Sequence, residues 1–539
     1  MTHQHTDADR DSALAEQAEL IAALRDPARY PHPVSNLQVL ETHISWVILT
    51  GSFAYKIKKA VDFGFLDFST LQKRRFYCEE ELRLNRRFAP DLYLQVMPLT
   101  GSRQQPQWCG SGQPLEYAVR MRQFPQAGLL SEVAARQALS TAHIDELALL
   151  VAAMHVQVAV AGADSSYGLP HDVRHWVMEN FSHIRPLLVS AEQQQELRQL
   201  EDWCRQEFGH EHTLLDERRR DGFVRECHGD LHLGNLALIE GRITPFDGIE
   251  FNPQLAWIDV MSEVAFLFMD LQDRGYAGFA WRFLNGYLQQ SGDYAGVRLL
   301  PYYLVYRALV RAKVAVLRLG QAGLDAGAGQ AAREEYNTYL QLARQYTQDR
   351  RPAMIITNGV SGSGKSWYAA RLAEQFGAIR VRSDVERKRL FGFAADADTG
   401  SGIQSGIYST SASDKTYTEL ARLSQHILAA GYPVIVDAAF LKRAERERFR
   451  QLAADLQVAF VMLSCSAPES VLRQRLQARQ AASNDPSEAG IAVLDAQLES
   501  QELPGVDERD EQISIGPGDD LSADTLAERV RIQINAPAS

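Results

Sequence analysis

The residues from Gly359 to Ser366 have the types and spacing needed to hold a nucleoside triphosphate. They read Gly-Val-Ser-Gly-Ser-Gly-Lys-Ser and fit the P-loop pattern G-x-x-x-x-G-K-[ST]. Glycines let the backbone turn so that its N–H groups point at a polyphosphate, and the positive end of a following helix adds to the attraction. We expect Lys365 to act on the β- and γ-phosphates during catalysis and the Ser366 hydroxyl to ligate Mg²⁺. The predicted nucleotide-binding residues here are Gly359, Ser361, Gly362, Ser363, Gly364, Lys365 and Ser366.

A second group of polar residues, Cys227–Asn235, lies near the middle of the chain. It reads Cys-His-Gly-Asp-Leu-His-Leu-Gly-Asn, so that Asp230 and Asn235 fit the spacing H-x-D-x-x-x-x-N. A carboxylate in such a loop can orient an attacking hydroxyl and accept its proton, and an amide oxygen shortly after it can ligate the metal ion on the phosphates. Asp247 ends a predicted hairpin, where a further carboxylate could hold the same metal. The plainer alternative is a turn that Asp230 and Asn235 cap.

The chain after the P-loop carries a third set of charged residues. The apolar run Val434–Asp437 ends in a carboxylate, which is the pattern of a strand that presents an acid to Mg²⁺. Asp384 follows a predicted strand over 378–382 and could simply be the N-cap of the next helix. A predicted helix over 469–480 is basic, which suits either a lid over the transferred phosphoryl group or a solvated helix face. We assign Arg473 and Arg479 to the nucleotide, and Arg475 lies between them.

Regular elements must position these residues. The apolar run Ala353–Thr357 supplies the strand that a P-loop needs before it, and Trp367–Phe376 has the apolar spacing of the helix that must follow. Near the N-terminus, Ile44–Thr50 and Phe53–Lys58 are strand-like runs joined by Gly51-Ser52, which predicts a hairpin. Other predicted elements are helices over 13–24, 71–88, 301–319 and 331–346, strands over 115–124, 236–239, 242–246 and 458–464, and a loop over 320–330.

Two lysines on the second of these strands could also contact a nucleotide. Because side chains alternate along a strand, Lys56 and Lys58 share one face, from which a lysine could reach an α- or β-phosphate. The alternative is that both are solvated on an edge strand.

The stretch His228–Asn235, together with Phe246-Asp-Gly-Ile-Glu250, resembles the aminoglycoside phosphotransferase family, a branch of the protein-kinase-like fold. The resemblance covers roughly 36–345 and implies a small N-terminal β-lobe, a larger helical lobe and ATP bound between them. It implies that the backbone of 120–124 contacts adenine, and the family's acidic-x-Ala signature appears as Glu263-Val-Ala265. By position, it also implies that Asp230 is the catalytic base and that Asn235 and Asp247 ligate Mg²⁺. It implies that Lys56 binds the phosphates and that Glu81 is the salt-bridge partner of Lys56.

The C-terminal part, about 353–539, resembles small P-loop kinases of the gluconate kinase, chloramphenicol phosphotransferase, zeta toxin and polynucleotide kinase group. The resemblance implies Asp384 as the base that faces the acceptor hydroxyl and Arg387 as a ligand of the phosphate or the acceptor. The segment 484–489 looks like a turn that opens the next helix. The order of the two parts resembles a bacterial family of fused phosphotransferase-like and P-loop ATP-binding proteins. The implied fold is an α+β protein-kinase-like bilobal domain followed by an α/β P-loop NTPase domain with a mainly parallel sheet.

Composition agrees with a globular enzyme of several domains. The chain has 539 residues, 45% of them apolar and 23% charged, which predicts two to four domains. A net charge of −12 disfavours a strong non-specific nucleic-acid binder. The five cysteines are scattered without metal spacing, which predicts free thiols in a reducing compartment. The first ten residues are polar, and the most apolar stretch, 147–163, is interrupted by polar residues. We therefore expect a cytoplasmic protein without a membrane span.

These observations lead to one preferred reading and two alternatives. We expect an N-terminal helix and loop over 1–35, a kinase-like domain over 36–346, a linker over 347–352 and a P-loop domain over 353–539. The preferred function is an ATP- and Mg²⁺-dependent phosphotransferase with two nucleotide sites and a small-molecule hydroxyl acceptor. In the first alternative, one domain is a catalytically silent nucleotide sensor. The second is a nucleic-acid 5′-kinase, favoured by Asp384-x-x-Arg387 and disfavoured by the acidic charge. The sequence does not predict an oligomeric state.

Overall fold

The computed structural model describes residues 7–64, 66–188, 190–319, 325–395, 397, 407, 409–482, 490–516, 519 and 521–535. The chain forms two compact units, each assembled from separate stretches of the sequence. The first contains Met1–Ser140, Met154–Trp176 and His212–Asp270, and the second contains Thr141–Ala153, Val177–Glu211 and Leu271–Ser539. The expected linker, 347–352, lies inside the second unit, and the domain boundaries stay predictions. The turn expected over 484–489 lies outside the described residues, as do residues 320–324 of the expected loop.

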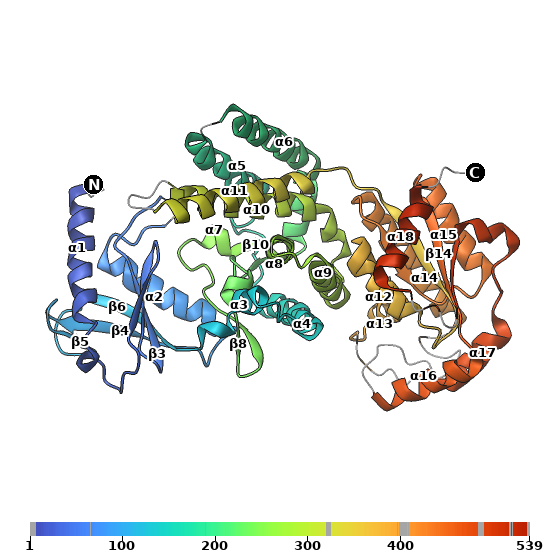
Figure 1. Ribbon diagram of the computed structural model, residues 1–539, viewed down its shortest axis with the longest axis horizontal. Helices are drawn as coiled ribbons and strands as arrows, with labels where there is room; N and C mark the ends of the chain where they lie inside the picture. Colours follow the sequence, from blue (N-terminus) through green and yellow to red (C-terminus); the bar gives the residue numbers. More distant parts are fainter. Residues whose placement is uncertain are drawn as a thin grey trace. The chain divides into compact units, whose positions relative to one another are not determined.

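The first unit contains a six-stranded antiparallel sheet (Figure 1). Its strands in spatial order are β1 Gln38–Glu41, β2 Ser45–Leu49, β3 Phe53–Lys58, β6 Glu116–Arg122, β4 Tyr93–Gly101 and β5 Pro106–Trp108. The predicted hairpin is confirmed, since β2 pairs with β3 about Gly51-Ser52. β3 lies between β2 and β6, and both Lys56 and Lys58 are buried. The alternative of two solvated lysines on an edge strand is therefore wrong.

Side-chain alternation divides β3 between two layers. Tyr55 and Ile57 belong to an apolar core to which α1 (Asp7–Ala23) contributes, a helix that starts earlier than predicted. Lys56 and Lys58 face the other side, where α2 (Leu71–Arg86) packs against the sheet. The second layer of this unit therefore contains ionisable groups, and it is where the candidate site lies.

Two short antiparallel pairs hold the loop Cys227–Asn235 in the first unit. β7 (Val224–Glu226) precedes the loop and pairs with β10 (Trp257–Asp259). β8 (Leu236–Ile239) follows it and pairs with β9 (Arg242–Pro245), as predicted. The remaining helices up to this point are α3 Leu130–Ala135, α4 Thr141–Gln157, α5 Pro170–Ile184, α6 Ala191–Arg220, α7 Pro253–Ala256 and α8 Val260–Asp273. The division between the units runs through α4, α5, α6 and α8.

The second unit is built on a five-stranded parallel sheet (Figure 1). Its strands in spatial order are β12 Ile379–Arg382, β13 Val434–Asp437, β11 Ala353–Asn358, β14 Ala459–Cys465 and β15 Gln512–Ile515. Every residue of β11 and β13 is buried, as expected for parallel strands that helices cover on both faces. The P-loop joins β11, the middle strand, to α12 (Lys365–Phe376). The predicted fold class, with an antiparallel β-layer in the first part and a parallel P-loop sheet in the second, is confirmed.

Helices cover this parallel sheet. α12 shares an apolar core with α18 (Ala523–Asn535) and the strands β11, β13, β14 and β15. The other helices of this part are α13 Ser383–Leu390, α14 Thr410–Ala429, α15 Arg443–Asp455, α16 Glu469–Ala482 and α17 Ile491–Ser500. Three helices that precede the P-loop in the sequence also belong to the second unit, namely α9 Ala277–Ser291, α10 Leu300–Leu319 and α11 Ala326–Tyr346. α10 and α11 pack along each other, and α9 packs against α12 and β12.

No helix in the described part of the chain combines the length and the apolar character needed to cross a membrane. All five cysteines lie in the described residues and carry free thiols, as predicted. Cys109 is exposed, and the other four are buried.

Candidate active sites

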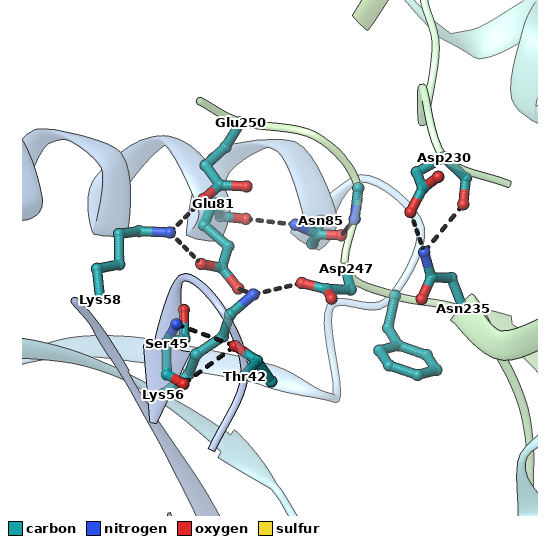
Figure 2. Close-up of polar contacts among 12 residues, drawn as sticks. Thr42, Ser45, Lys56, Lys58, Glu81, Asn85, Asp230, Asn235, Asp247 and Glu250 are labelled. Carbon is teal, nitrogen blue, oxygen red and sulfur yellow. Dashed lines mark hydrogen bonds and ion pairs between the residues drawn. The ribbon is translucent and has the colours of Figure 1, made fainter. Parts of the chain in front are cut away.

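Lys56 is the central cation of a buried ion network in the first unit (Figure 2). Its Nζ donates to Glu81 Oε1 at 2.9 Å and also pairs with Asp247. Lys58 Nζ donates to Glu81 Oε2 at 2.7 Å and pairs with Glu250. The lysines come from β3, Glu81 from α2, and the other two carboxylates from the segment after β9. The structure thus brings the predicted Lys56, Glu81 and Asp247 together. It adds Lys58 and Glu250, for which strand alternation and the acidic end of Phe246–Glu250 were the available signals.

The two lysines of this network face three carboxylates, which leaves one negative charge in excess. Burial alone would lower the pKa of Lys56, but Asp247, Glu81 and Glu250 raise it well above its usual value. Burial alone would raise the pKa of Glu81, whereas the charges of Lys56 and Lys58 lower it to about 2. Burial raises the pKa of Glu250 in spite of the nearby Lys58. The lysines therefore stay charged, and the excess negative charge favours a further cation beside Asp247.

Hydrogen bonds from two elements fix the backbone around Asp247. Asp247 has a φ of 62°, a conformation that is costly for a residue other than glycine. Its N–H donates to the Tyr93 hydroxyl at 2.9 Å, and the next N–H, of Gly248, donates to Asn85 Oδ1 at 2.9 Å. Asn85 Nδ2 in turn donates to the Glu81 carbonyl oxygen at 2.9 Å. The helix α2, which carries Glu81, therefore also positions Asp247, the predicted metal ligand.

Asp230 and Asn235 contact each other directly. Asn235 Nδ2 donates to Asp230 Oδ2 and to the Asp230 carbonyl oxygen, both at 2.9 Å (Figure 2). This orientation turns the amide nitrogen to Asp230, so that the amide oxygen is the atom that could ligate a metal. His232 Nε2 lies 3.4 Å from Asp230 Oδ2. The N–H of Phe246 donates to the Asn235 carbonyl oxygen at 3.0 Å, which holds the loop beside Asp247.

His228 ties the same loop to the segment that carries Asp247. Its Nε2 lies 2.9 Å from the carbonyl oxygen of Phe246, the residue before Asp247. Burial lowers the pKa of His228 below its usual value, so the ring is neutral and donates an N–H to that carbonyl. The role of His228 in this geometry is to position Asp247, and the ring has no need to change protonation state.

Glu263, the acid of the Glu263-Val-Ala265 signature, supports the loop from behind. Its Oε1 accepts the N–H of Gly229 at 2.8 Å, and its Oε2 pairs with His155 Nε2 at 2.9 Å. Burial would raise the pKa of Glu263, whereas its contacts with His155 lower it. His155, Cys227 and Glu263 also bring three buried metal-type donors within 4.8 Å of one another. Because Glu263 already has both hydrogen bonds, we assign this trio to holding the loop.

The P-loop in the second unit has the backbone of a phosphate cradle. Gly359 has a φ of 142°, and a Cβ there would lie 2.4 Å from the Cys465 carbonyl oxygen, so only glycine fits. Gly364 is the N-cap of α12, which opens the helix N-terminus toward the loop. Among the described residues, Ser363 Oγ is buried without a hydrogen-bond partner, which fits a group that binds a phosphate oxygen. Lys365 Nζ lies 3.4 Å from a carbonyl oxygen of the same loop.

Asp437, at the end of β13, lies against the P-loop. The Ser366 hydroxyl donates to Asp437 Oδ1 at 3.0 Å, which brings two of the predicted metal ligands together. A hydroxyl and a carboxylate are oxygen donors of the kind that Mg²⁺ prefers. Arg380 Nε and Nη2 donate to Asp437 Oδ2 at 3.1 and 2.5 Å, and Arg382 Nε lies 3.9 Å from the same oxygen. Burial would raise the pKa of Asp437, whereas these two arginines lower it. The sequence reasoning missed both arginines.

Asp384 and Arg387 both lie on α13. Asp384 is in the first turn of the helix, whose N-cap is Arg382, so the N-cap alternative for Asp384 is wrong. Arg387 is buried, and its Nη1 donates to the carbonyl oxygen of Ile407 at 2.8 Å and to Ser413 Oγ at 3.3 Å. Its guanidinium is thus directed at the start of α14. The acceptor roles of Asp384 and Arg387 stay predictions.

Arg475, one of three arginines on α16, contacts the P-loop. Its Nη1 donates to the carbonyl oxygen of Gly362 at 3.1 Å. Arg473 instead pairs with Glu469 of its own helix and with Asp495 of α17. The sequence predicted a helix over 469–480 but could not fix which arginine faces the loop. The assignment of Arg473 and Arg479 to the nucleotide stays a prediction.

A cavity of about 640 Å³ opens next to the P-loop residues Ser363 and Gly364. Aromatic, apolar and basic side chains share its wall, among them Trp367, Tyr368, Pro468, Val471, Ile515 and Arg475. Pockets that bind small molecules combine apolar walls with a few polar groups in this way. The cavity is large enough for a nucleobase with its ribose, and it borders the P-loop.

The backbone of 120–124, for which a contact with adenine is expected, is partly used by the sheet, and the contact itself stays a prediction. The backbone of Arg120–Arg122 pairs with β3 on one side and with β4 or Leu92 on the other. The N–H of Gln123 donates to the Ser52 carbonyl oxygen at 3.0 Å. Because the sheet already uses these groups, the expected contact with adenine would fall to the carbonyl oxygen of Gln123 and the backbone of Phe124.

Comparison with known proteins gives matches along most of the chain. A family model described as an AAA domain matches residues 354–504. The uncharacterized protein Rv2004c of Mycobacterium tuberculosis (strain ATCC 25618 / H37Rv) is 30% identical over 468 residues, which are 86% of this chain and 91% of the mycobacterial one. The uncharacterized protein Mb2027c of Mycobacterium bovis (strain ATCC BAA-935 / AF2122/97) matches with the same values.

Solved structures match each part of the chain at low identity. Amicoumacin kinase hAmiN, in complex with AMP-PNP, Ca²⁺ and Ami, covers 62% of this chain and 96% of its own, at 14% identity and a TM-score of 0.38. A gluconokinase from Sinorhizobium meliloti 1021 covers 34% of this chain and 98% of its own, at 24% identity and a TM-score of 0.24.

Proposed function

The chain belongs to the family of the mycobacterial proteins Rv2004c and Mb2027c, and we propose that it is a cytoplasmic, ATP- and Mg²⁺-dependent phosphotransferase with two nucleotide sites. Each site would transfer the γ-phosphoryl group to a hydroxyl of a small molecule. One observation carries the proposal: each unit joins a cation for the phosphates to a carboxylate for the metal. In the first unit, Lys56 pairs directly with Asp247. In the second unit, Lys365 is joined to Asp437 by its neighbour Ser366, whose hydroxyl donates to that carboxylate.

In the first unit, Lys56 would bind the phosphates while Glu81 holds it in place. Asp230 would orient the acceptor hydroxyl and accept its proton, because its carboxylate is partly exposed and fixed by Asn235. Mg²⁺, when bound by Asn235 and Asp247, would neutralise the charge of the phosphates. The excess negative charge of the lysine–carboxylate network supports this fit.

In the second unit, the P-loop backbone and Lys365 would hold the β- and γ-phosphates. Ser366 and Asp437 would share Mg²⁺, and the cavity beside Trp367 and Tyr368 would take the nucleoside. Asp384 is our proposal for the base that faces the acceptor. The unpaired Ser363 hydroxyl and the fit of glycine alone at position 359 support phosphate binding.

The sensor alternative has one observation in its favour. Arg380 donates two hydrogen bonds to Asp437, the carboxylate that we assign to the metal of the P-loop site. This is compatible with a site that binds nucleotide without turning it over. ATP turnover that persists in full when Lys365 is replaced by Ala would favour this reading.

Two substitutions in the first unit test the proposed division of roles. In a chain that also carries Lys365→Ala, so that turnover reports the first site, Asp230→Asn should lower phosphoryl transfer by ~10²-fold or more and leave ATP affinity nearly unchanged. Asp247→Ala should instead weaken Mg-ATP binding itself. ATP consumption would be followed with a panel of sugars, nucleosides, aminoglycosides and oligonucleotides, and affinity by calorimetry.

The exposed Asp91 offers a matched control, and Asp91→Asn should change neither quantity. An equal loss of nucleotide affinity in the Asp230 and Asp247 variants would contradict the assigned roles.

A further inference from the structure

We propose that α9 is part of the P-loop active site: Asn285 of α9 holds the edge strand β12 so that Arg380 lies on Asp437, where Arg380 competes with Mg²⁺. This inference rests on the proposed function of the second unit as a Mg²⁺-dependent nucleotide site. It makes Asn285 a positioning residue and Arg380 a resident cation that the metal must displace.

Asn285 completes the outer edge of β12. β12 is the terminal strand of the parallel sheet, and the N–H of Ile379 points inward, to the Pro433 carbonyl oxygen at 2.9 Å. The backbone groups on either side of it therefore point outward. Asn285 Oδ1 accepts the N–H of Arg380 at 2.7 Å, and Asn285 Nδ2 donates to the Ala378 carbonyl oxygen at 3.0 Å. A single amide thus replaces the neighbouring strand that this edge lacks.

The helix that carries Asn285 is itself fixed to the P-loop fold. Trp281 packs against Gly377, the C-cap of α12, where an added Cβ would lie 3.1 Å from the indole ring. The same ring lies edge-on to Tyr432, with centroids 5.9 Å apart. Arg282 Nη1 donates to Glu374 Oε1 on α12 at 2.6 Å. α9 therefore contacts α12 and Tyr432 about one turn before the Asn285 bridge, and its position and that of β12 are linked.

The side chain of Arg380, on β12, neutralises Asp437, the carboxylate that we assign to the metal. Arg380 contacts Asp437 Oδ2 through two nitrogens, and Ser366 takes the other oxygen. A divalent cation on Asp437 would lie beside the guanidinium and be repelled by it, because both would approach the same buried oxygen atoms. Binding of the metal therefore requires that Arg380 move away from Asp437. The apparent Mg²⁺ affinity is the intrinsic affinity multiplied by the fraction of molecules in which Arg380 has moved away.

The first test measures the Mg²⁺ requirement of the P-loop site in the full-length chain. All variants carry Asp247→Ala to silence the first site, and the probe is a fluorescent ATP analogue titrated at increasing Mg²⁺. Arg380→Met should lower the half-saturating Mg²⁺ concentration by about tenfold, and Asn285→Ala by about threefold, because the strand that holds Arg380 is loosened. Gln290→Ala, an exposed amide on the same helix, should have no effect.

The second test needs no nucleotide. Hydrogen exchange at the Arg380 amide should be at least about tenfold faster in Asn285→Ala than in the parent chain, since its acceptor is gone. Asn285→Asp keeps the acceptor and loses only the donor to Ala378, so the Arg380 amide should stay protected. With Mg²⁺ alone as the probe, the melting temperature should rise more in Arg380→Met than in the parent chain.

Three results would overturn the inference. A higher Mg²⁺ requirement in Arg380→Met, or weaker nucleotide binding at saturating Mg²⁺, would make Arg380 a phosphate ligand. Unchanged exchange at the Arg380 amide in Asn285→Ala would remove the role of α9. Loss of all nucleotide binding in the Asp247→Ala parent would instead refute the proposed function of the second unit, and the exchange and Mg²⁺-only measurements would still decide the inference.

Discussion

Replacement of Lys58 by Met should destabilise the first unit strongly, although Lys58 has no assigned role in catalysis. The Lys58 side chain is 1% exposed and contacts two carboxylates, Glu81 and Glu250, which are 0% and 4% exposed. At an effective dielectric constant of about 20, unit charges 2.7 Å apart attract by about 6 kcal/mol, and desolvation of the ions offsets part of this. Removal of one partner of a buried pair typically costs about 3–5 kcal/mol, because the other charge stays buried alone.

A local measurement suits a chain of two units, because global unfolding need not be two-state. Native-state hydrogen exchange of the α2 amides around Glu81 gives the free energy of opening of this layer, and we expect Lys58→Met to lower it by about 3–5 kcal/mol. The double variant Lys58→Met/Glu250→Gln removes the orphaned charge and should recover about 2 kcal/mol. Arg75→Ala, which breaks the exposed pair with Glu79, should be indistinguishable from the parent chain.

The loss in Lys58→Met should also depend on pH. Burial already raises the pKa of the Glu250 carboxyl above its ordinary value of 4.5, and removal of Lys58 takes away a charge that lowers it. The folded variant would therefore hold a proton on Glu250 at pH values where the unfolded chain has already lost it. Stability therefore falls as pH rises from 4.5 through the folded-state pKa, so the variant should be less impaired near pH 5 than at pH 8. A loss below about 1 kcal/mol, or a double variant whose loss is the sum of the single ones, would refute the reasoning.

Three further predictions concern both sites. The parent chain should bind two equivalents of Mg-ATP in calorimetry and Lys365→Ala one, and a single site in the parent would contradict the proposal of two nucleotide sites. Gly359→Ala should abolish nucleotide binding by the P-loop, because its Cβ would lie 2.4 Å from the Cys465 carbonyl oxygen, whereas Gly209→Ala, with open space around it, should bind normally. Burial lowers the pKa of His228 in the folded state, so as the pH drops below 6.5 the unfolded chain takes up a proton there before the folded chain does, and the stability of the first unit should fall. His228→Asn should flatten this part of a profile of melting temperature against pH, and an unchanged profile would contradict the prediction.

Local patterns in the sequence predicted the parts of both sites that lie on contiguous residues. The P-loop is a single turn with its own helix, so Gly359–Ser366 could be read directly, and its elements formed where expected. Asp437 and Lys56 could be predicted because each lies on a strand with a clear apolar pattern. Glu81 was found through a family resemblance, and the structure places it 2.9 Å from Lys56.

The rest could not be predicted because it depends on contacts between distant stretches of the chain. Asn285 and Arg380 are 95 residues apart, and neither has a sequence pattern that points to the other. The choice among Arg473, Arg475 and Arg479 depends on the rotation of α16 about its axis, which a basic helix does not fix. The polar segment 347–352 has the composition of a linker, yet the helices α9, α10 and α11 before it belong to the second unit, and α9 supplies an edge contact to β12.

The interleaving of the two units along the chain bears on how the protein is synthesised. When the ribosome has made Asp270, all stretches of the first unit exist, but most of the second unit has still to be made. At about 5–20 residues per second, translation of Leu271–Ser539 takes about 15–50 s. During this time the early stretches Thr141–Ala153 and Val177–Glu211, which contribute buried side chains such as Leu147 and Val151, lack the rest of their unit. We therefore expect nascent chains of this family to depend on chaperones, and genes truncated before the P-loop to give aggregated products.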